Sequence, residues 1–241
     1  MKRRTRTTLL FTRHFILCIV TLAGTPSLSV AQAPDEELQS ERRLRKEIFL
    51  GYHKWDELAE LSPAGGGSFD SNGFNLGAAF HWRMGEWGRS DVLAGLDFAL
   101  FSNDSNVRHI GDDLISRGLY ITPSIKLMFD NGTGPVYALD FGLGYYLVDI
   151  ADVSFFDFGG YSEDQLWEDS AFGGYLGASV DFPSKKSNRL AGFSMSAKIH
   201  FFDLGKVADE GPVFVAPGTL GSDAGSLSGP VVMLQFGYYW F

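Results

Sequence analysis

The sequence predicts an all-β protein, a closed eight-stranded antiparallel up-and-down transmembrane β-barrel. Three observations support this fold class. Eight segments between residues 48 and 241 alternate apolar side chains with small or polar ones, at the period of two that strands require. These runs are about 9 to 11 residues long, which matches a tilted strand crossing a bilayer. Short and long connections alternate strictly between them, as three short turns and four long loops.

Residues 1–31 are predicted to form a cleaved secretory signal peptide. Basic residues from Lys2 to Arg13 precede an apolar run, Phe15 to Ala23, which is too short to span a bilayer as a helix. Cleavage fits after Ala31 or after Ala33, and we favour Ala31 because Pro34 would obstruct a peptidase at the second position. Cleavage removes the one cysteine of the chain, so the mature protein is expected to lack disulfides, as bacterial envelope proteins usually do.

Residues 32–47 are predicted to be a polar periplasmic leader, a solvated tail in which acidic and basic residues follow one another without an apolar stripe. The signal peptide contains five basic residues and no acidic one, so its removal changes the net charge from −9 to −14. A field of this sign disfavours binding to nucleic acid.

The barrel domain is predicted over residues 48–241. Its first strand, 48–55, alternates least clearly, whereas 74–83 sets Phe74, Leu76, Phe80 and Trp82 against small and polar residues. The same pattern recurs in 91–101, 119–129, 137–147, 171–182, 191–202 and 229–240. We expect the bulky face to meet lipid and the face of Gly, Ala, Ser, Tyr and a few charges to fill a narrow lumen. A soluble barrel or sandwich, with its bulky face inward, is the alternative.

The connections set the predicted topology. The short ones are 85–90, 130–135 and 183–189, and the long ones are 56–73, 102–118, 151–170 and 203–226. Outer-membrane barrels have short periplasmic turns and long extracellular loops, so both termini are expected on the periplasmic side. Closure removes the sheet edges that a bilayer cannot solvate.

The C-terminus resembles the assembly signal of bacterial outer-membrane β-barrel proteins, because the last strand ends on Phe241 after several aromatic residues. The resemblance is to the broad class, and it is strongest to the small eight-stranded barrels. It implies that Gln235, Gly237, Trp240 and Phe241 are read by the outer-membrane assembly machinery, although Phe241 stands one residue early for the last position of the signal. It also implies a location in the bacterial outer membrane, in contact with outer-membrane lipid.

Five charged residues fall on the predicted lumen face, namely Asp97, Lys126, Asp140, Asp181 and Lys198. Buried charges need partners, so we expect a structural ion-pair network, with a proton or ion path as the alternative. A turn at 131–135 sets Lys126 opposite Asp140 and, on the lipid face, Phe129 opposite Tyr137.

The sequence predicts no catalytic, cofactor or metal site. The histidines His53, His81, His109 and His200 lack the spacing of metal ligands. Eight-stranded barrel enzymes that deacylate lipid A use a His followed two residues later by a Ser, but Phe202 occupies that position after His200. A Gly-x-Ser-x-Gly motif is also absent from the sequence.

The long loops are predicted to form an acidic crown. They hold 17 acidic residues against Arg108, Arg117 and Lys206. Glu163, Asp164, Glu168 and Asp169 are expected to gather on a short helical turn and to screen cations weakly. Loop 151–170 is also rich in aromatic residues, which predicts either packing over the barrel mouth or binding.

These observations together predict a structural or surface-interaction protein of the cell envelope, with a side-chain-filled lumen. A lipid-A-modifying enzyme and a narrow channel for small apolar solutes are the alternatives.

Overall fold

The computed structural model describes residues 44–61, 69–88, 90–105, 112–156, 160–185, 189–207 and 225–241. The predicted signal peptide and residues 32–43 of the predicted leader lie outside the described residues. Within the described ranges, no helix is long and apolar enough to cross a membrane.

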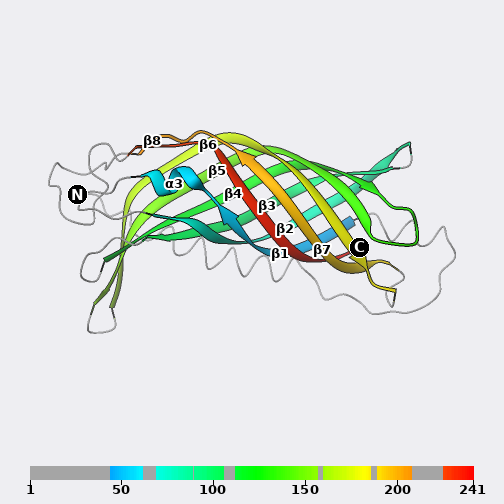
Figure 1. Cartoon of the computed structure of the whole chain (residues 1–241), viewed down its shortest axis with the longest axis horizontal. Coiled ribbons are helices and arrows are strands. Elements are labelled where there is room, and N and C mark those ends of the chain that lie inside the picture. The colour runs from blue at the N-terminus through cyan, green and yellow to red at the C-terminus, as the bar shows by residue number, and fades with distance from the viewer. Residues whose placement is uncertain are drawn as a thin grey trace.

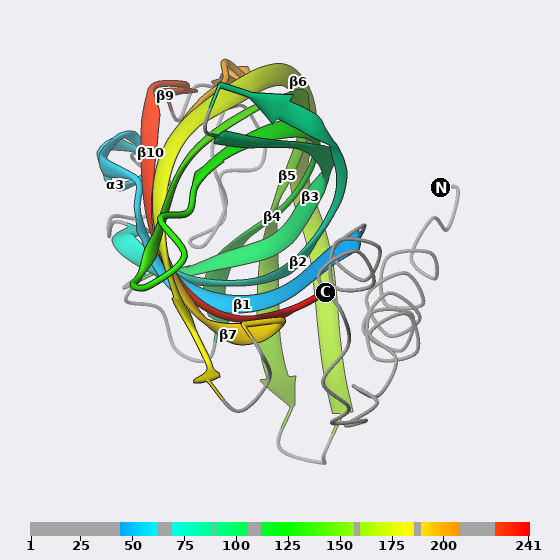
Figure 2. The same ribbon diagram turned by 90° about the vertical axis from the view of Figure 1, so that its right-hand side faces the viewer.

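Eight strands form a closed antiparallel barrel in the order β1-β10-β7-β6-β5-β4-β3-β2, which confirms the predicted fold class. Figure 2 shows the strands surrounding a central axis. The wall strands are β1 (Leu44–Lys54), β2 (Phe69–Trp87), β3 (Ser90–Ser105), β4 (Asp112–Phe129), β5 (Val136–Phe156), β6 (Gly160–Pro183), β7 (Ala191–Phe201) and β10 (Pro230–Trp240). Each pairs with its sequence neighbour, and β1 closes the ring by pairing with β10.

The two ends of the barrel differ. The connections 130–135 and 184–190 are tight, and Arg189 and Gly132 take the positive φ angles that such turns need. The C-terminus lies at this turn end, where β1 also begins (Figure 1), as the pairing of Lys46 with Trp240 requires. The opposite end, here called the loop end, carries α3 (Asp56–Glu60) and the two-stranded sheet of β8 (Gly205–Val207) and β9 (Gly225–Leu227).

The strand register matches the one predicted from the turn at 131–135. Lys126 is paired with Asp140, and Phe129 with Tyr137. Side chains therefore alternate as predicted from Val136 to Ile150 of β5, where even-numbered residues face the lumen and odd-numbered residues face out.

Several predicted boundaries need correction. β1 begins at Leu44, four residues before the predicted start of the domain, so the end of the supposed leader is part of the wall. β5 and β6 are 21 and 24 residues long, well beyond the predicted 9 to 11. Most of the predicted loop 151–170 consequently belongs to a β-hairpin, and the connection between the two strands is residues 157–159.

Candidate functional site

The lumen contains a polar cluster centred on the Asp97 carboxylate of β3. The Lys198 ammonium lies 2.8 Å from Asp97 Oδ2, and His81 Nε2 lies 3.2 Å from Oδ1. The hydroxyls of Ser124 and Tyr175 also donate to this carboxylate. Asp97 is 1 % exposed, so its charge is held inside the wall by partners from four other strands.

A second ion pair joins neighbouring strands. Lys126 Nζ lies 3.3 Å from Asp140 Oδ1, and Ser179 Oγ donates to Asp140 Oδ2 at 3.0 Å. Both charged side chains are buried. The strand register therefore brings Lys126 and Asp140 together inside the lumen.

A third cluster was missed by sequence reasoning, because its basic residue stood in the supposed leader. Arg45 of β1 binds Asp181 of β6 through its guanidinium and lies 2.8 Å from Glu47 Oε2. The guanidinium also stacks over the ring of Tyr239, 4.2 Å from its centroid. Arg45 is fully buried, so this part of the predicted leader is a lumen residue and not a solvated tail. One feature of the sequence could have revealed this cluster: Arg45, Glu47 and Phe49 alternate along the chain and continue the inward face of β1.

Glycines make room for the large side chains of the lumen. A Cβ built on Gly142 would overlap the ring of Tyr175, and one on Gly173 would lie 3.0 Å from Tyr146 Cε2. The small inward face predicted from the sequence therefore accommodates rings that cross from other strands, which is how a narrow barrel fills its interior.

Aromatic residues close the loop end. Trp55 packs edge-to-face on Phe101 and Phe202 at centroid distances of 6.2 and 5.3 Å, and Phe202 stacks on Tyr146 at 4.5 Å. Above them, the Glu57 carboxylate accepts hydrogen bonds from the N–H and the hydroxyl of Ser228. Helix α3 is thereby fastened to the segment that leads into β10, above the apolar layer.

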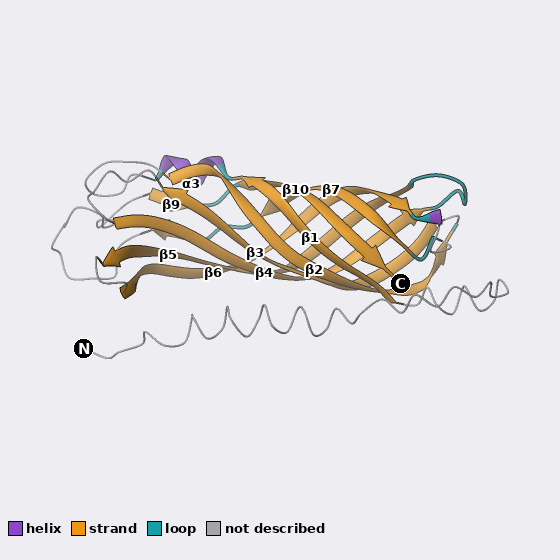
Figure 3. Cartoon of the chain, turned by 90° about the horizontal axis from the view of Figure 1, so that it is seen from below, coloured by secondary structure: helices purple, strands orange, loops and turns teal. Residues whose placement is uncertain are grey.

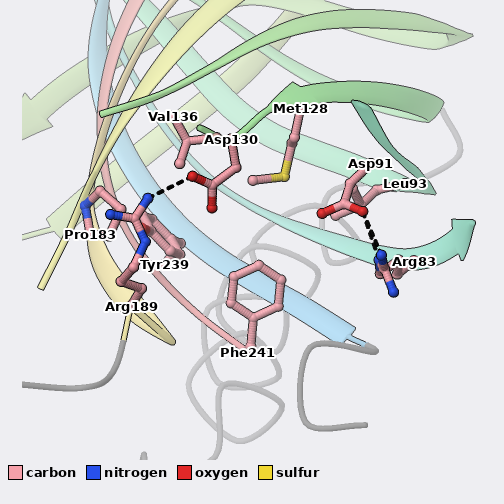
Figure 4. A pocket seen from close by; sticks show the side chains of 10 residues that line it. All are labelled: Arg83, Asp91, Leu93, Met128, Asp130, Val136, Pro183, Arg189, Tyr239 and Phe241. Carbon is pink, nitrogen blue, oxygen red and sulfur yellow. Dashed lines mark hydrogen bonds and ion pairs between the residues drawn. The ribbon is translucent and has the colours of Figure 1, made fainter. Parts of the chain in front are cut away.

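The turn end is closed by the ring of Phe241, which packs against a cluster of Leu93, Met128, Val136 and Ala138. Figure 4 shows the pocket at this end, with Arg189 paired to Asp130 and Arg83 paired to Asp91. Its free volume is about 20 Å³, and a second cavity beside the Asp97 cluster holds about 10 Å³. The inner cavity has room for about one water molecule.

Two of the predicted histidines, His53 and His200, are buried and contact polar side chains of the lumen. His200 is fully buried, its Nδ1 lies 2.9 Å from the Tyr146 hydroxyl, and its ring packs on Tyr120. His53 Nε2 lies 2.6 Å from Asn103 Oδ1 inside the loop-end layer. In the ranges that the structure describes, no three His, Cys, Asp or Glu side chains are placed to hold a metal ion.

The outward face of the wall is apolar, with large aromatic residues at both ends. On β2, β5 and β7, such residues stand eight positions apart, as the pairs Phe74 and Trp82, Tyr137 and Tyr145, and Phe193 and Phe201. All six side chains are exposed, by 49 to 76 %. Eight residues span about 26 Å along a strand, or about 20 Å in height at a tilt of about 40°. Aliphatic side chains, among them Leu76, Leu139, Leu143, Met195 and Ile199, are exposed between them.

The residues of the predicted assembly signal lie on both faces of β10. Gln235 is buried in the lumen and donates to Asn75 Oδ1 at 3.1 Å and to the Tyr120 hydroxyl at 3.3 Å. A Cβ on Gly237 would lie 2.5 Å from Ser194 Oγ. Trp240 stacks on Tyr238, whereas Phe241 has the opposite parity and covers the turn end of the lumen.

The acidic residues of the predicted crown do not gather on a helical turn. Glu163, Asp164, Glu168 and Asp169 all belong to β6, where Glu163 is paired with Val153 and Asp164 with Asp152. Glu168 and Asp169 are exposed. The expected helical turn is therefore wrong, because these residues belong to a strand. Trp167 of the same segment is buried in the main apolar cluster.

No protein-family model matches the sequence, and no curated protein matches it. Among solved structures, the chain is similar to Neisserial surface protein A, at 13% identity over 82% of this chain and 96% of that one, with a TM-score of 0.43. It is similar to Ail of Yersinia pestis in complex with the heparin analogue sucrose octasulfate, at 14% identity over 82% and 99% of the two chains, with a TM-score of 0.38. It is also similar to the outer membrane protein OprG from Pseudomonas aeruginosa, at 15% identity over 83% of this chain and 97% of that one, with a TM-score of 0.39. The fold assignment rests on the strand registers of this chain itself.

Proposed function

We propose that this chain is a bacterial outer-membrane β-barrel protein that spans the membrane without a pore and acts in envelope structure or in contacts at the cell surface. The observation that carries the proposal is the outward face of the barrel. A soluble protein rarely exposes a continuous apolar surface of this kind, whereas a bilayer favours it and places aromatic rings at its two interfaces.

The interior supports a role without transport. Charged and polar side chains fill the lumen in the three clusters around Asp97, Asp140 and Arg45, and apolar layers cover both of its ends. The two cavities described above are too small for a solute larger than water. This packing counts against a narrow channel for apolar solutes, and the buried His200 counts against a lipid-A-modifying enzyme.

The proposed route to the membrane follows from the sequence. Residues 1–31 direct export and are cleaved after Ala31 or Ala33, and the segment from Gln235 to Phe241 is read by the assembly machinery. The loop end, with its excess of acidic residues, then faces the outside of the cell and provides the contact surface.

Cell fractionation combined with gel mobility tests the proposal. The full chain, produced in a Gram-negative host, should sediment with the outer membrane and should migrate faster on a detergent gel before boiling than after it. Recovery in the soluble periplasmic fraction, with one mobility before and after boiling, would overturn the proposal.

A further inference from the structure

Strand β6 has two different edges at the loop end. Its pairing with β5 continues as far as Phe156 and Gly160, but its pairing with β7 ends at Gly174 and Phe201. From Asp169 to Phe172, no described strand pairs with β6 on the β7 side, whereas Gly173 still packs against Phe201 and Phe202. Figures 1 and 3 show the tips of β5 and β6 apart from α3 and from the small sheet of β8 and β9.

Beyond β7 the chain turns away from β6. Phe202, the first residue after β7, keeps the inward direction of His200, is 6 % exposed and stacks on Tyr146. Asp203 Oδ1 then accepts a hydrogen bond from the N–H of Gly205, whose φ of 76° directs the chain into β8. The departure is therefore built into the fold.

The backbone at Ser170 faces the edge that β7 has left. Its N–H donates to Asp169 Oδ1 at 2.7 Å, so this N–H is not used in pairing with β5. A carboxylate over an edge N–H is a common protection against unwanted strand pairing. A cationic side chain from an incoming strand could draw this carboxylate away and leave the N–H for a backbone carbonyl.

The surroundings favour a cationic partner. The Asp169 carboxylate is exposed on this segment. In the sequence, the four predicted loop segments together carry 17 acidic residues against three basic ones. On the outward face, Phe172 and Tyr145 are 63 % and 67 % exposed and pack edge-to-face at 5.6 Å, next to the expected membrane surface. A second copy of this chain would bring the same carboxylates and would be repelled.

We propose that the β6 edge from Asp169 to Phe172 binds an extended, lysine- or arginine-rich peptide segment of a partner protein by strand addition. Backbone hydrogen bonds would provide the pairing, and the Asp169 carboxylate would favour a cationic side chain. The inference rests on the proposed function, because the edge faces the outside of the cell only when the barrel spans the outer membrane.

The test uses the full mature chain in nanodiscs of zwitterionic phosphatidylcholine, which do not attract a basic peptide. The probe is a fluorescent peptide of alternating Lys and Val, and the measurement is its anisotropy. Ser170→Pro, which removes the edge N–H and adds a ring there, should weaken binding by about tenfold or more. Ser170→Ala keeps the N–H and should change binding by less than about twofold.

A second probe separates strand addition from simple charge attraction. The same peptide with N-methyl groups on alternate residues keeps its charge but cannot pair along one edge, and it should also bind about tenfold more weakly. Unchanged affinity of Ser170→Pro, or equal affinity of the two peptides, would overturn the inference. The inference would also be overturned if the unmodified chain formed dimers and Ser170→Pro made it monomeric, because the edge would then bind a second copy of this chain.

The outcomes remain distinguishable from failure of the proposed function. A chain that inserts into nanodiscs and shows heat-modifiable mobility, but binds neither peptide, refutes only the edge site. A chain that stays soluble without lipid refutes the membrane-spanning barrel itself.

Discussion

Replacing Asp97 with Ala should destabilise the barrel strongly, because this carboxylate neutralises a buried ammonium. Lys198 is 5 % exposed and its Nζ has Asp97 Oδ2 at 2.8 Å. Breaking a buried pair from one side costs about 3–5 kcal/mol. With a urea slope of about 2 kcal/mol per M, the unfolding midpoint in vesicles should fall by about 2 M.

The double variant Asp97→Ala/Lys198→Met provides the control, since it removes both charges and leaves no uncompensated ion. It should recover about 2 kcal/mol or more of the loss caused by Asp97→Ala alone. Tryptophan fluorescence during urea unfolding measures both variants. The reasoning is refuted if Asp97→Ala unfolds at the midpoint of the unmodified chain, or if the double variant is as unstable as the sum of the two single variants.

Deleting Phe241 should lower the folded yield in cells more than the refolding yield in detergent. Its half-buried ring contributes roughly 1.5–3 kcal/mol at most, whereas the resemblance places it in the assembly signal; equal losses would contradict this. Gly142→Ala should cost about 1–3 kcal/mol in urea unfolding, because its methyl group would overlap a buried tyrosine ring, while Gly134→Ala in the open turn should be neutral. Calcium titration followed by tryptophan fluorescence should give a shallow response that monovalent salt reproduces, since Glu168 and Asp169 point to opposite faces. A saturable change lost on replacing both with Asn would show a real cation site.

The central part of the barrel wall could be predicted from sequence because its two faces impose a pattern on it. An apolar outer face and a narrow lumen force the alternation seen in 137–147, and a tight turn at 131–135 leaves one register that satisfies both faces. That register is also what brings Lys126 and Asp140 together.

The pattern ends beyond the apolar outer band of the wall. Above the apolar band, both faces of β6 between residues 160 and 170 can carry polar side chains, so no period of two indicates a strand there. Arg45 was misjudged for a related reason, since a charged residue in a polar stretch reads as solvated until its partner Asp181 is known to lie across the lumen. Contacts between residues so distant in sequence leave no local signal.

Quenching by brominated lipid tests the central claim, that the apolar outer face of this barrel meets the bilayer. Two single-tryptophan chains would be compared, one keeping Trp82, which is 51 % exposed on the wall, and one keeping Trp55, which is fully buried in the loop-end layer. The other tryptophans would be replaced by Phe. The membrane-spanning barrel predicts strong quenching of Trp82 and little quenching of Trp55, and equal or absent quenching at the two positions would contradict it.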